Sequence, residues 1–376
     1  MLDGVQLTVM IGPVVPLPIS YDVLEALESV EVTSTVGSRS VFQMTFKLSP
    51  RSPLHTLFLV AGGSSLPFVR VVIAVTLRGT PEVLIDGVVT QTNVTPGSSA
   101  SDTASLVVTG EDLSRVMDYI DFSGTPFPAL PAEARVALLM LKYAIFGVVP
   151  LVIPSVLFDV PIPTERIPRQ DGTDLAYVTS LADEVGYDFY VEPGPVPGAS
   201  IAYWGPQVRI GVPQPALNVG MDAQTNVGAL SFGYDGSSRV VPILFIQEPI
   251  SKFPIPIPIP DVTPLSPPLG IISPFPNLVE LENDTSKRSP IQAAAIALAK
   301  AAKSADAVSG QGSLDVMRYG RVLRARRLVG VRGAGPAFDG LHFVKSVTHK
   351  IKRGEFKQDF QLVRNGLVST VPRVPT

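Results

Sequence analysis

The sequence predicts a mainly β protein that contains a small α+β insertion. Segments of alternating apolar and polar residues fill the first part of the chain and return after residue 216, which is the period-2 pattern of half-buried strands. A short Asp-Gly motif occurs in both parts, at Asp86-Gly87 and at Asp339-Gly340. The length of 376 residues allows about two to four modules of ordinary size. These observations predict two related antiparallel β-barrels with a different module between them.

The first barrel is predicted over residues 1–120. In the segment Val41 to Leu48, every second residue is apolar from Phe42 onward, so one face of this strand is expected to be buried. Three further strands are predicted by segments rich in β-branched residues: Val69 to Leu77, Val83 to Val94 and Thr103 to Thr109. From Glu111 to Ile120 the apolar spacing changes to that of a helix.

Residues 121–212 are predicted to form an α+β module. Helices are expected at Ala132 to Ala144 and at Thr173 to Val185, where the apolar residues form one stripe. Asp171 or Thr173 is expected to cap the second helix through a side-chain oxygen. Two short strands follow, Tyr187 to Glu192 and Ser200 to Trp204.

A proline-rich segment interrupts the second barrel, which is predicted from residues 213–248 and 308–376. Between Pro242 and Pro276 there are 11 prolines in 35 residues, and proline lacks the N–H that the middle of a sheet requires. Residues 249–307 are therefore predicted to be an inserted polyproline strap and a helix that begins at Ser289-Pro290. The strap is expected to pack on its own protein or on a neighbouring subunit; a ligand for a proline-recognising domain is the alternative.

The second barrel is completed by three predicted strands after the strap. They are Val322 to Arg332, Leu341 to Ile351 and Phe356 to Val363, with a turn at Arg353-Gly354 between the last two. In both barrels the Asp-Gly motif precedes a stretch of strand, Val88 to Val94 or Leu341 to Ile351, that is followed, after a turn region, by another strand. This repetition is the sequence evidence that the barrels are related.

Composition limits the class of protein. Hydrophobic residues make up 45% of the chain and charged residues 17%, which predicts that partners cover much of the surface. A membrane protein is the alternative, but no run of about 20 apolar residues is present, so stable membrane insertion is not expected. No signal peptide is read at the start, and we expect assembly in the cytoplasm. With 0 cysteines, disulfides and cysteine-bound metals are excluded.

Charge is unevenly distributed. Residues 315–364 hold 12 Lys or Arg against 4 Asp or Glu, although the whole chain has a net charge of -3. The densest group consists of six arginines: Arg318, Arg321, Arg324, Arg326, Arg327 and Arg332. They are interpreted either as a solvated strand face or as a contact ring or lumen lining. Because aromatic platforms are missing between them, a basic face that meets an acidic protein is favoured over nucleic-acid binding.

The sequence does not predict catalysis, a metal or a cofactor. The histidines are His55, His342 and His349, and the last two lie seven apart in one predicted strand, which places them on opposite faces unless a bulge intervenes. Three carboxylate groups are candidates for acid–base chemistry: Asp171/Asp174, Asp183/Glu184 and Glu280/Glu282/Asp284. They are interpreted as a helix cap, a solvated helix face and a polar strand edge. The glycines of residues 330–335 are interpreted as a hairpin turn, because no helix follows to bind phosphate.

Three stretches of the chain resemble the tail hub proteins of contractile phages, known as late-control protein D, and the hub part of the VgrG spike protein of type VI secretion. They are Asp86–Thr90 with Val107–Leu113, Gln170–Leu175 with Leu181–Val191, and Phe338–His349. The resemblance covers most of the chain in the same order. It implies two similar tail-hub barrels in each subunit, and a homotrimer that presents six barrels in a ring.

The function that the resemblance implies is structural. The trimer would be a baseplate hub with pseudo-sixfold symmetry that connects a hexameric inner tube to a trimeric spike, within a phage tail or a tail-like particle. Its expected partners are the inner tube protein, a separate spike protein and peripheral baseplate proteins. The proline-rich segment departs from the family pattern. Two alternatives stay open: a tail-associated cell-wall hydrolase, and a tail-tip protein that binds a receptor or carbohydrate.

Overall fold

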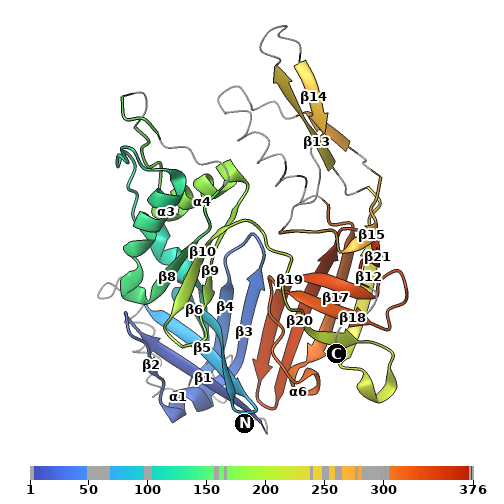
Figure 1. Ribbon diagram of the computed structural model, residues 1–376. Helices are drawn as coiled ribbons and strands as arrows, with labels where there is room; N and C mark the ends of the chain where they lie inside the picture. The colour runs from blue at the N-terminus through green and yellow to red at the C-terminus, as the bar shows by residue number, and fades with distance from the viewer. Residues whose placement is uncertain are drawn as a thin grey trace.

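The computed structural model is dominated by antiparallel strands, as expected, with a few short helices (Figure 1). It describes residues 4–48, 68–96, 104–155, 161–164, 167–237, 240–247, 254–258, 265–275, 278–281, 305–371, and the single residues 298, 301 and 374. His55 and the helix predicted from Ser289 lie outside the described residues, except for Leu298 and Ala301.

The main sheet has 13 strands and runs through both β-rich parts of the chain. Its first half contains β1 (Val5–Gly12), β2 (Leu17–Pro18), β3 (Leu27–Thr35), β4 (Val41–Leu48), β5 (Arg70–Leu77), β6 (Thr80–Thr95) and β7 (Ala104–Asp112). Its second half contains β11 (Gln214–Asn218), β12 (Val227–Tyr234), β17 (Val308–Asp315), β18 (Leu328–Arg332), β19 (Gly340–Lys352) and β20 (Glu355–Arg364). The halves lie side by side in Figure 1, with the first in blue and the second mostly in red.

The two halves repeat one strand order. The first reads β3-β4-β7-β6-β5-β1, and the second reads β12-β17-β20-β19 with β18 and then β11 beside β19. All neighbouring strands are antiparallel in both halves, except that β11 is parallel to β18 whereas β1 is antiparallel to β5. The shared strand order therefore shows that the two halves are related, as the sequence predicted.

The halves also carry β-bulges at matching places. The extra residue Thr90 in β6 faces β7, and the extra residue Lys345 in β19 faces β20. Likewise Glu28 is the extra residue of β3 where it pairs with β4, and Gly228 is the extra residue of β12 where it pairs with β17. Because a bulge bends and twists its strand, these matching bulges bend the two halves at equivalent positions.

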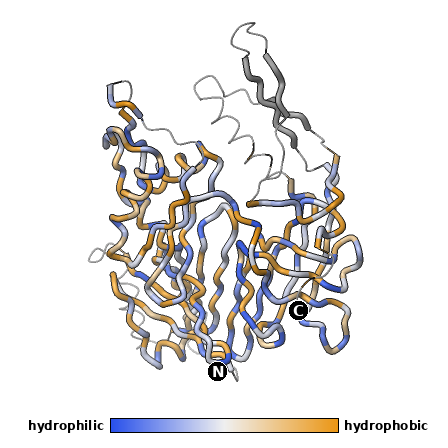
Figure 2. The backbone as a smooth tube through the Cα atoms, viewed as in Figure 1, coloured by the Kyte–Doolittle hydropathy of each residue, from blue (hydrophilic) through white to orange (hydrophobic). Residues whose placement is uncertain are grey.

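One contact between strands joins the halves. Strand β19 is longer than β18, so its second part, from Ser346 to Lys352, has an edge that β18 does not reach, and β3 pairs there in antiparallel register. A single hydrophobic core then extends beneath both halves, from Phe42 and Met44 in the first to Phe356 and Phe360 in the second. The apolar and polar residues alternate along these strands in Figure 2. In β4 the even positions are buried, as the sequence predicted.

The α+β module has its own core and lies above the first half (Figure 1). Helices α3 (Ala132–Leu141) and α4 (Asp174–Val185) pack with a small sheet of β8 (Val148–Val152), β9 (Asp188–Pro193) and β10 (Ser200–Gly205). Thr173 caps α4, since its Oγ1 accepts a hydrogen bond from the N–H of Ala176, and Gly186 ends it with a φ of 70°. The helix predicted from Glu111 is instead a short 3-10 helix, η1 (Leu113–Asp118).

The remaining short elements connect these parts. They are α1 (Tyr21–Ala26), η2 (Ala144–Phe146), η3 (Asp222–Gln224), α6 (Val316–Tyr319), and the pair β15 (Gly270–Ile272) with β21 (Leu367–Ser369). Within the proline-rich segment, β14 (Pro254–Pro258) lies at one edge of a sheet with β13 (Val240–Gln247) and β16 (Leu278–Leu281), so these residues form a strand where a polyproline helix was expected. The edge position is consistent with proline's missing donor. The domain boundaries drawn from the sequence stay a prediction.

One predicted strand begins later than expected. The sequence predicted a strand from Val322, but β18 begins at Leu328. At Leu323 the backbone N–H donates to Oε1 of Gln358, and the backbone carbonyl accepts from Nε2 of the same residue. The buried Gln358 side chain therefore provides the hydrogen bonds that a neighbouring strand would otherwise provide. A period-2 pattern cannot distinguish these two ways of satisfying backbone groups.

Candidate functional site

The most extensive candidate site is the outward face of the joined sheet, which we call the polar face. It consists of the exposed or half-exposed side chains of the strands from β12 to β4: Ser29, Glu31, Thr33, Thr35, Gln43, Thr45, Lys47, Ser231, Ser309, Gln311, Ser313, Ser346, Thr348, Lys350, Asp359 and Gln361. Hydroxyl and amide groups predominate on it. Such a face offers hydrogen bonds but little apolar area for adhesion.

Hydroxyl pairs cross the seam between β3 and β19. The Oγ1 atoms of Thr33 and Thr348 lie 3.0 Å apart, and Oγ1 of Thr35 lies 2.9 Å from Oγ of Ser346. These cross-strand pairs are of the kind that contributes about 0.2–1 kcal/mol each to sheet stability. They stabilise the register in which the two halves meet.

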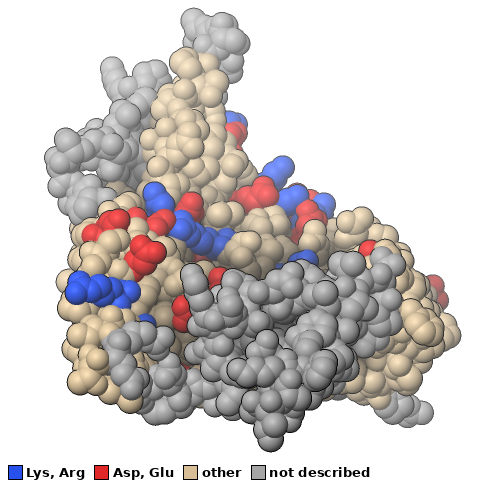
Figure 3. Space-filling model, turned by 90° about the horizontal axis from the view of Figure 1, so that it is seen from above, with Lys and Arg blue, Asp and Glu red and all other residues tan. Residues whose placement is uncertain are grey.

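Charged residues on the polar face occur mainly near the turn between β19 and β20, and ion pairs balance several of them. Nζ of Lys350 lies 2.6 Å from Oδ2 of Asp359, and beside the polar face Lys357 pairs with Glu355. Each partner raises the pKa of its lysine, through a hydrogen bond first and charge second. Figure 3 views the molecule from above, where most of the described surface is uncharged and both signs are interspersed.

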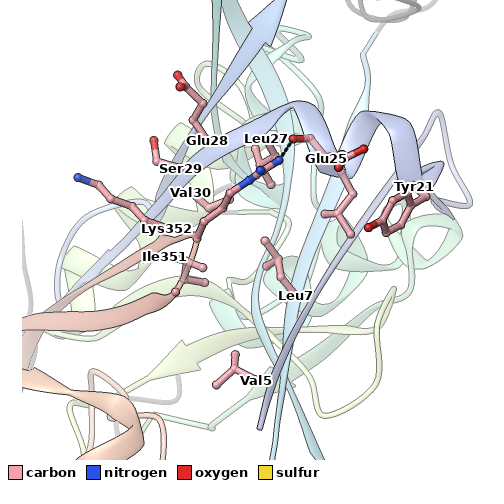
Figure 4. A pocket seen from close by; sticks show the side chains of 13 residues that line it. Val5, Leu7, Tyr21, Glu25, Leu27, Glu28, Ser29, Val30, Ile351 and Lys352 are labelled. Carbon is pink, nitrogen blue, oxygen red and sulfur yellow. Dashed lines mark hydrogen bonds between the residues drawn. The ribbon is translucent and has the colours of Figure 1, made fainter. Parts of the chain in front are cut away.

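A groove lies next to the turn between β19 and β20 (Figure 4). It has a volume of about 220 Å³ and lies between α1, β1, β3 and the β19–β20 turn. Val5, Leu7 and Val30 contribute apolar side chains to its wall, and Arg353 donates a hydrogen bond to the carbonyl oxygen of Glu25. This bond connects the second half of the sheet to α1 of the first.

Two strand edges form a second kind of candidate site. Among the described residues, β12 pairs only with β17, and β6 beyond Val89 pairs only with β7. Val94 on β6 is 44% exposed and Tyr234 on β12 is 43% exposed. Unpaired strand edges with exposed apolar side chains are templates for pairing with another chain. Sequence patterns did not reveal these edges, because an edge is defined by the strand order of the folded sheet.

The six arginines do not form one ring within the chain. Arg318, Arg321 and Arg327 are exposed. The other three bind other parts of the protein: Arg324 pairs with Glu82 of β6 at 3.1 Å, Arg326 donates to the carbonyl of Thr35 at 2.8 Å, and Arg332 donates to the carbonyl of Val374. The structure places Arg318 on α6, Arg332 at the end of β18 and the other four on the loop between them, rather than on one strand face. Their role in contacts between subunits stays a prediction.

The two described histidines are buried. The bulge at Lys345 shifts the phase of β19, so His342 and His349 both point inward, and the expectation of opposite faces is wrong because of that bulge. Burial lowers the pKa of each to about 3, assisted by the charge of Arg364 near His342 and of Arg324 near His349. Nδ1 of His349 lies 2.9 Å from Nε2 of Gln358, whereas His342 packs against Phe232. A structural role for both stays a prediction.

Among the described carboxylate candidates, Asp174 has structural partners. Asp174 is buried and accepts hydrogen bonds from Nε2 of Gln170 at 2.7 Å and the hydroxyl of Tyr143 at 2.7 Å. Burial and this bond raise the pKa of Tyr143. Asp183 and Glu184 lie exposed on α4, as expected, and Glu280 lies in β16, while Glu282 and Asp284 lie outside the described residues. Within the described chain, no group of three or more His, Asp or Glu residues is arranged to hold a metal.

The glycine-rich residues 330–335 form the end of β18 and the turn to β19, which confirms the hairpin interpretation. No described helix is long and apolar enough to cross a membrane.

Comparison with known proteins gives matches of fold alone. No family model and no curated protein matches the chain. Among solved structures, a tail protein from Neisseria meningitidis MC58 is 14% identical, with a TM-score of 0.61 over 97% of this chain and 98% of that one. The 43 kDa tail protein of prophage MuSo2 from Shewanella oneidensis is 12% identical, with a TM-score of 0.61 over 96% of this chain and 98% of that one.

A chain of the Francisella PdpA-VgrG complex is also similar. It is 9% identical, with a TM-score of 0.59, and the match covers 99% of this chain and 60% of that one. The present chain therefore has the β-rich fold that these tail proteins share with a chain of a VgrG complex.

Proposed function

We propose that the protein is a structural baseplate hub, of the type represented by late-control protein D and the hub part of VgrG, and has no enzymatic role. The observation that carries the proposal is the repeat within the chain: two half-sheets share strand order and bulge positions and join through β3 and β19. A chain with two equivalent halves, present in three copies, offers six similar units around one axis. Such a ring matches a sixfold tube on one side and a threefold spike on the other.

In this proposal, residues 1–120 form one ring unit, and residues 213–248 with 308–376 form the other. The polar face lines the central channel, where hydroxyl and amide groups allow a tube or spike to fit without strong adhesion. The partners are the inner tube protein, a separate spike protein and peripheral baseplate proteins, within a phage tail or tail-like particle assembled in the cytoplasm. The likeness of fold to phage tail proteins supports this assignment.

The mass of the purified protein in solution tests the proposal. Sedimentation velocity and light scattering are expected to give three times the 40.0 kDa chain mass. Averaged electron-microscope images of the same sample are expected to show a ring with six similar lobes. A stable six-chain ring, or an assembly without a central channel, would contradict the proposal.

A further inference from the structure

We propose that strand β12 of one copy pairs with residues 91–95 of β6 in the next copy, in the same antiparallel register that β3 and β19 use within the chain. This inference rests on the proposed assembly of several copies into a ring and specifies how neighbouring copies bind. The partner at this surface is a second copy of the same chain.

The internal seam provides the template. Strand β3 occupies the same place in the first half as β12 in the second, and β19 occupies the same place as β6. Inside the chain, β3 pairs with the part of β19 that follows the bulge at Lys345. The matching partners, β12 and the part of β6 that follows the bulge at Thr90, both have a free edge among the described residues.

The bulges align the two seams residue by residue. Counted from the extra residues of β6 and β19, Gln91 corresponds to Ser346 and Asn93 to Thr348. Counted from the extra residues of β12 and β3, Gly233 corresponds to Thr33. Transfer of the β3–β19 register then predicts these pairs between copies: Gln91 with Asp235, Thr92 with Tyr234, Asn93 with Gly233, Val94 with Phe232, and Thr95 with Ser231. Pro96 follows and ends the ladder, because it has no N–H to donate.

The side chains have the pattern that this pairing requires. In the internal seam, Val32 faces His349, and both are buried, at 0% and 5% exposure. At the corresponding positions of the free edges, Val94 is 44% exposed and Phe232 is half-buried. Pairing would cover Val94 with Phe232 on the core side. Polar residues such as Asn93 and Thr95 would continue the polar face on the other side.

The contact is heterologous, because each copy provides a β12 edge on one side and a β6 edge on the other. Contacts of this type lead to rings when the rotation between copies closes. Since the internal seam and the proposed seam between copies are formed by equivalent strands with matching bulges, the two kinds of junction would alternate around the ring at similar angles.

Engineered disulfides test the register. The chain has 0 cysteines, so the pair Asn93→Cys/Gly233→Cys introduces the only thiols. Residues directly opposite on neighbouring antiparallel strands are close enough for a disulfide. At Gly233 a Cβ would approach only Oγ of Ser309, at 3.3 Å, which a hydroxyl rotation relieves. After oxidation, we expect a covalent species of three chains that a reducing agent converts to single chains.

Two control variants make the result specific. Thr33→Cys/Thr348→Cys is the equivalent pair at the internal seam, where the hydroxyl oxygens are 3.0 Å apart, and it should form a disulfide within one chain. Asn93→Cys/Tyr234→Cys shifts one cysteine by a single residue to the opposite face and should form no cross-link. Gln91→Cys/Asp235→Cys repeats the test two residues further along the same face.

The outcomes separate the pairing from the proposed assembly. If the protein has the mass of three chains and the internal control closes, but neither pair between copies cross-links, the pairing is overturned and the hub proposal stands. Cross-links in a particle of a different size would support the pairing and overturn the trimer. A protein that remains a single chain without cross-links would overturn both.

Discussion

Arg70 and Asp86 form a bidentate ion pair inside the protein. Nε and one terminal nitrogen of Arg70 donate to the two carboxylate oxygens at 2.7 and 2.6 Å, and the side chains are 3% and 1% exposed. The same guanidinium donates to the carbonyls of Val14 and Gly198, and Oγ of Ser200 donates to Asp86 at 3.2 Å. The pair therefore attaches the α+β module to the first half-sheet.

Removal of one partner from this pair is expected to destabilise the protein strongly. Arg70→Met leaves the Asp86 carboxylate buried without its cation, which typically costs about 3–5 kcal/mol. Urea unfolding followed by circular dichroism measures the loss. The double variant Arg70→Met/Asp86→Leu should recover much of it, because no charge is left buried.

An exposed ion pair provides the matched control for this experiment. Lys350 and Asp359 are 45% and 47% exposed, so Lys350→Met should cost at most about 1 kcal/mol. If Arg70→Met and Lys350→Met lowered the free energy of unfolding equally, burial would not determine the strength of the Arg70–Asp86 pair.

The buried histidines predict a loss of stability in mild acid. Their folded pKa of about 3 lies below the ordinary 6.5, so between these values the unfolded chain binds more protons than the folded one. The free energy of unfolding should therefore fall as pH decreases through this window and should not depend on these residues above it. From pH 7.5 to 5.5 each histidine should account for about 1.4 kcal/mol.

The variant His349→Gln tests this sign. It removes the titrating group next to Gln358, so its free energy of unfolding should fall by about 1.4 kcal/mol less than that of the original protein between the two pH values. Urea midpoints at both pH values provide the comparison. A variant that is equally sensitive to acid would show that His349 is protonated in the folded state.

Single residues were the least predictable level of the molecule. The sequence identified the arginine group but not that Arg324, Arg326 and Arg332 bind remote parts of the chain, since Glu82 lies 242 positions before Arg324. The Asp-Gly motif marked matching strands, although its two aspartates make different contacts. Asp86 pairs with Arg70, whereas Asp339 accepts a hydrogen bond from the N–H of Ala334. When the two halves are aligned by their bulges, the two motifs do not coincide, because Asp86 corresponds to Leu341 rather than to Asp339.

At the scale of elements, the N-cap of α4 connects the helix with η1. Oγ1 of Thr173 accepts the N–H of Ala176 at 3.2 Å and its hydroxyl donates to Asp118 at 2.8 Å. Burial alone would raise the pKa of Asp118, but the hydrogen bonds from Arg39 and Thr173 lower it below its ordinary value. The cap therefore belongs to a small polar cluster at the base of the module.

Loss of this cap should destabilise the module. Thr173→Ala removes both bonds and should cost about 1–2 kcal/mol. Trp204 lies in the core of the module and is the 1 tryptophan of the chain, so its fluorescence during urea unfolding reports the change. Thr179→Ala, at an exposed position within α4, is the control and should be neutral or slightly stabilising.

Elements with a strong period were predictable from sequence. Strand β4, helix α4 and the β19–β20 hairpin occur where apolar spacing, a cap or a turn glycine indicated them. Strand β17 was not found, because Gly310, Gly312 and its serines give no apolar alternation. Packing explains those glycines: a Cβ at Gly310 would overlap the ring of Phe232, and one at Gly312 would overlap the carbonyl oxygen of Ala229 and the ring of Phe360.

At the scale of the whole molecule, both half-sheets share one hydrophobic core. Phe42 in the first half and Phe360 in the second are each 2% exposed. Phe42→Ala and Phe360→Ala should each cost about 3–5 kcal/mol and shift one common unfolding transition of the sheet. Circular dichroism during urea unfolding tests this, with Phe275→Ala, at a site 90% exposed, as the control. Two separate transitions would show that the halves fold independently.

The repeat was visible in the sequence only as a short motif, while the joining of the halves was not visible at all. Pairing of β3 with β19 connects residues more than 300 positions apart, at Thr33 and Thr348. Bulges also leave no clear mark in a period-2 pattern, although they set the register on which the proposed contact between copies depends. Such information arises from the folded sheet rather than from local propensity.

Strand β14 has a consequence for solubility. Its residues alternate as Pro-Ile-Pro-Ile-Pro, and it pairs with β13 on one side. Since only the isoleucines have N–H groups, the donors of β14 serve β13, and the opposite side of the strand presents acceptors alone. A foreign strand that approached there would find no donor to bind, so this margin of the molecule resists the uncontrolled stacking of sheets that leads to fibrils.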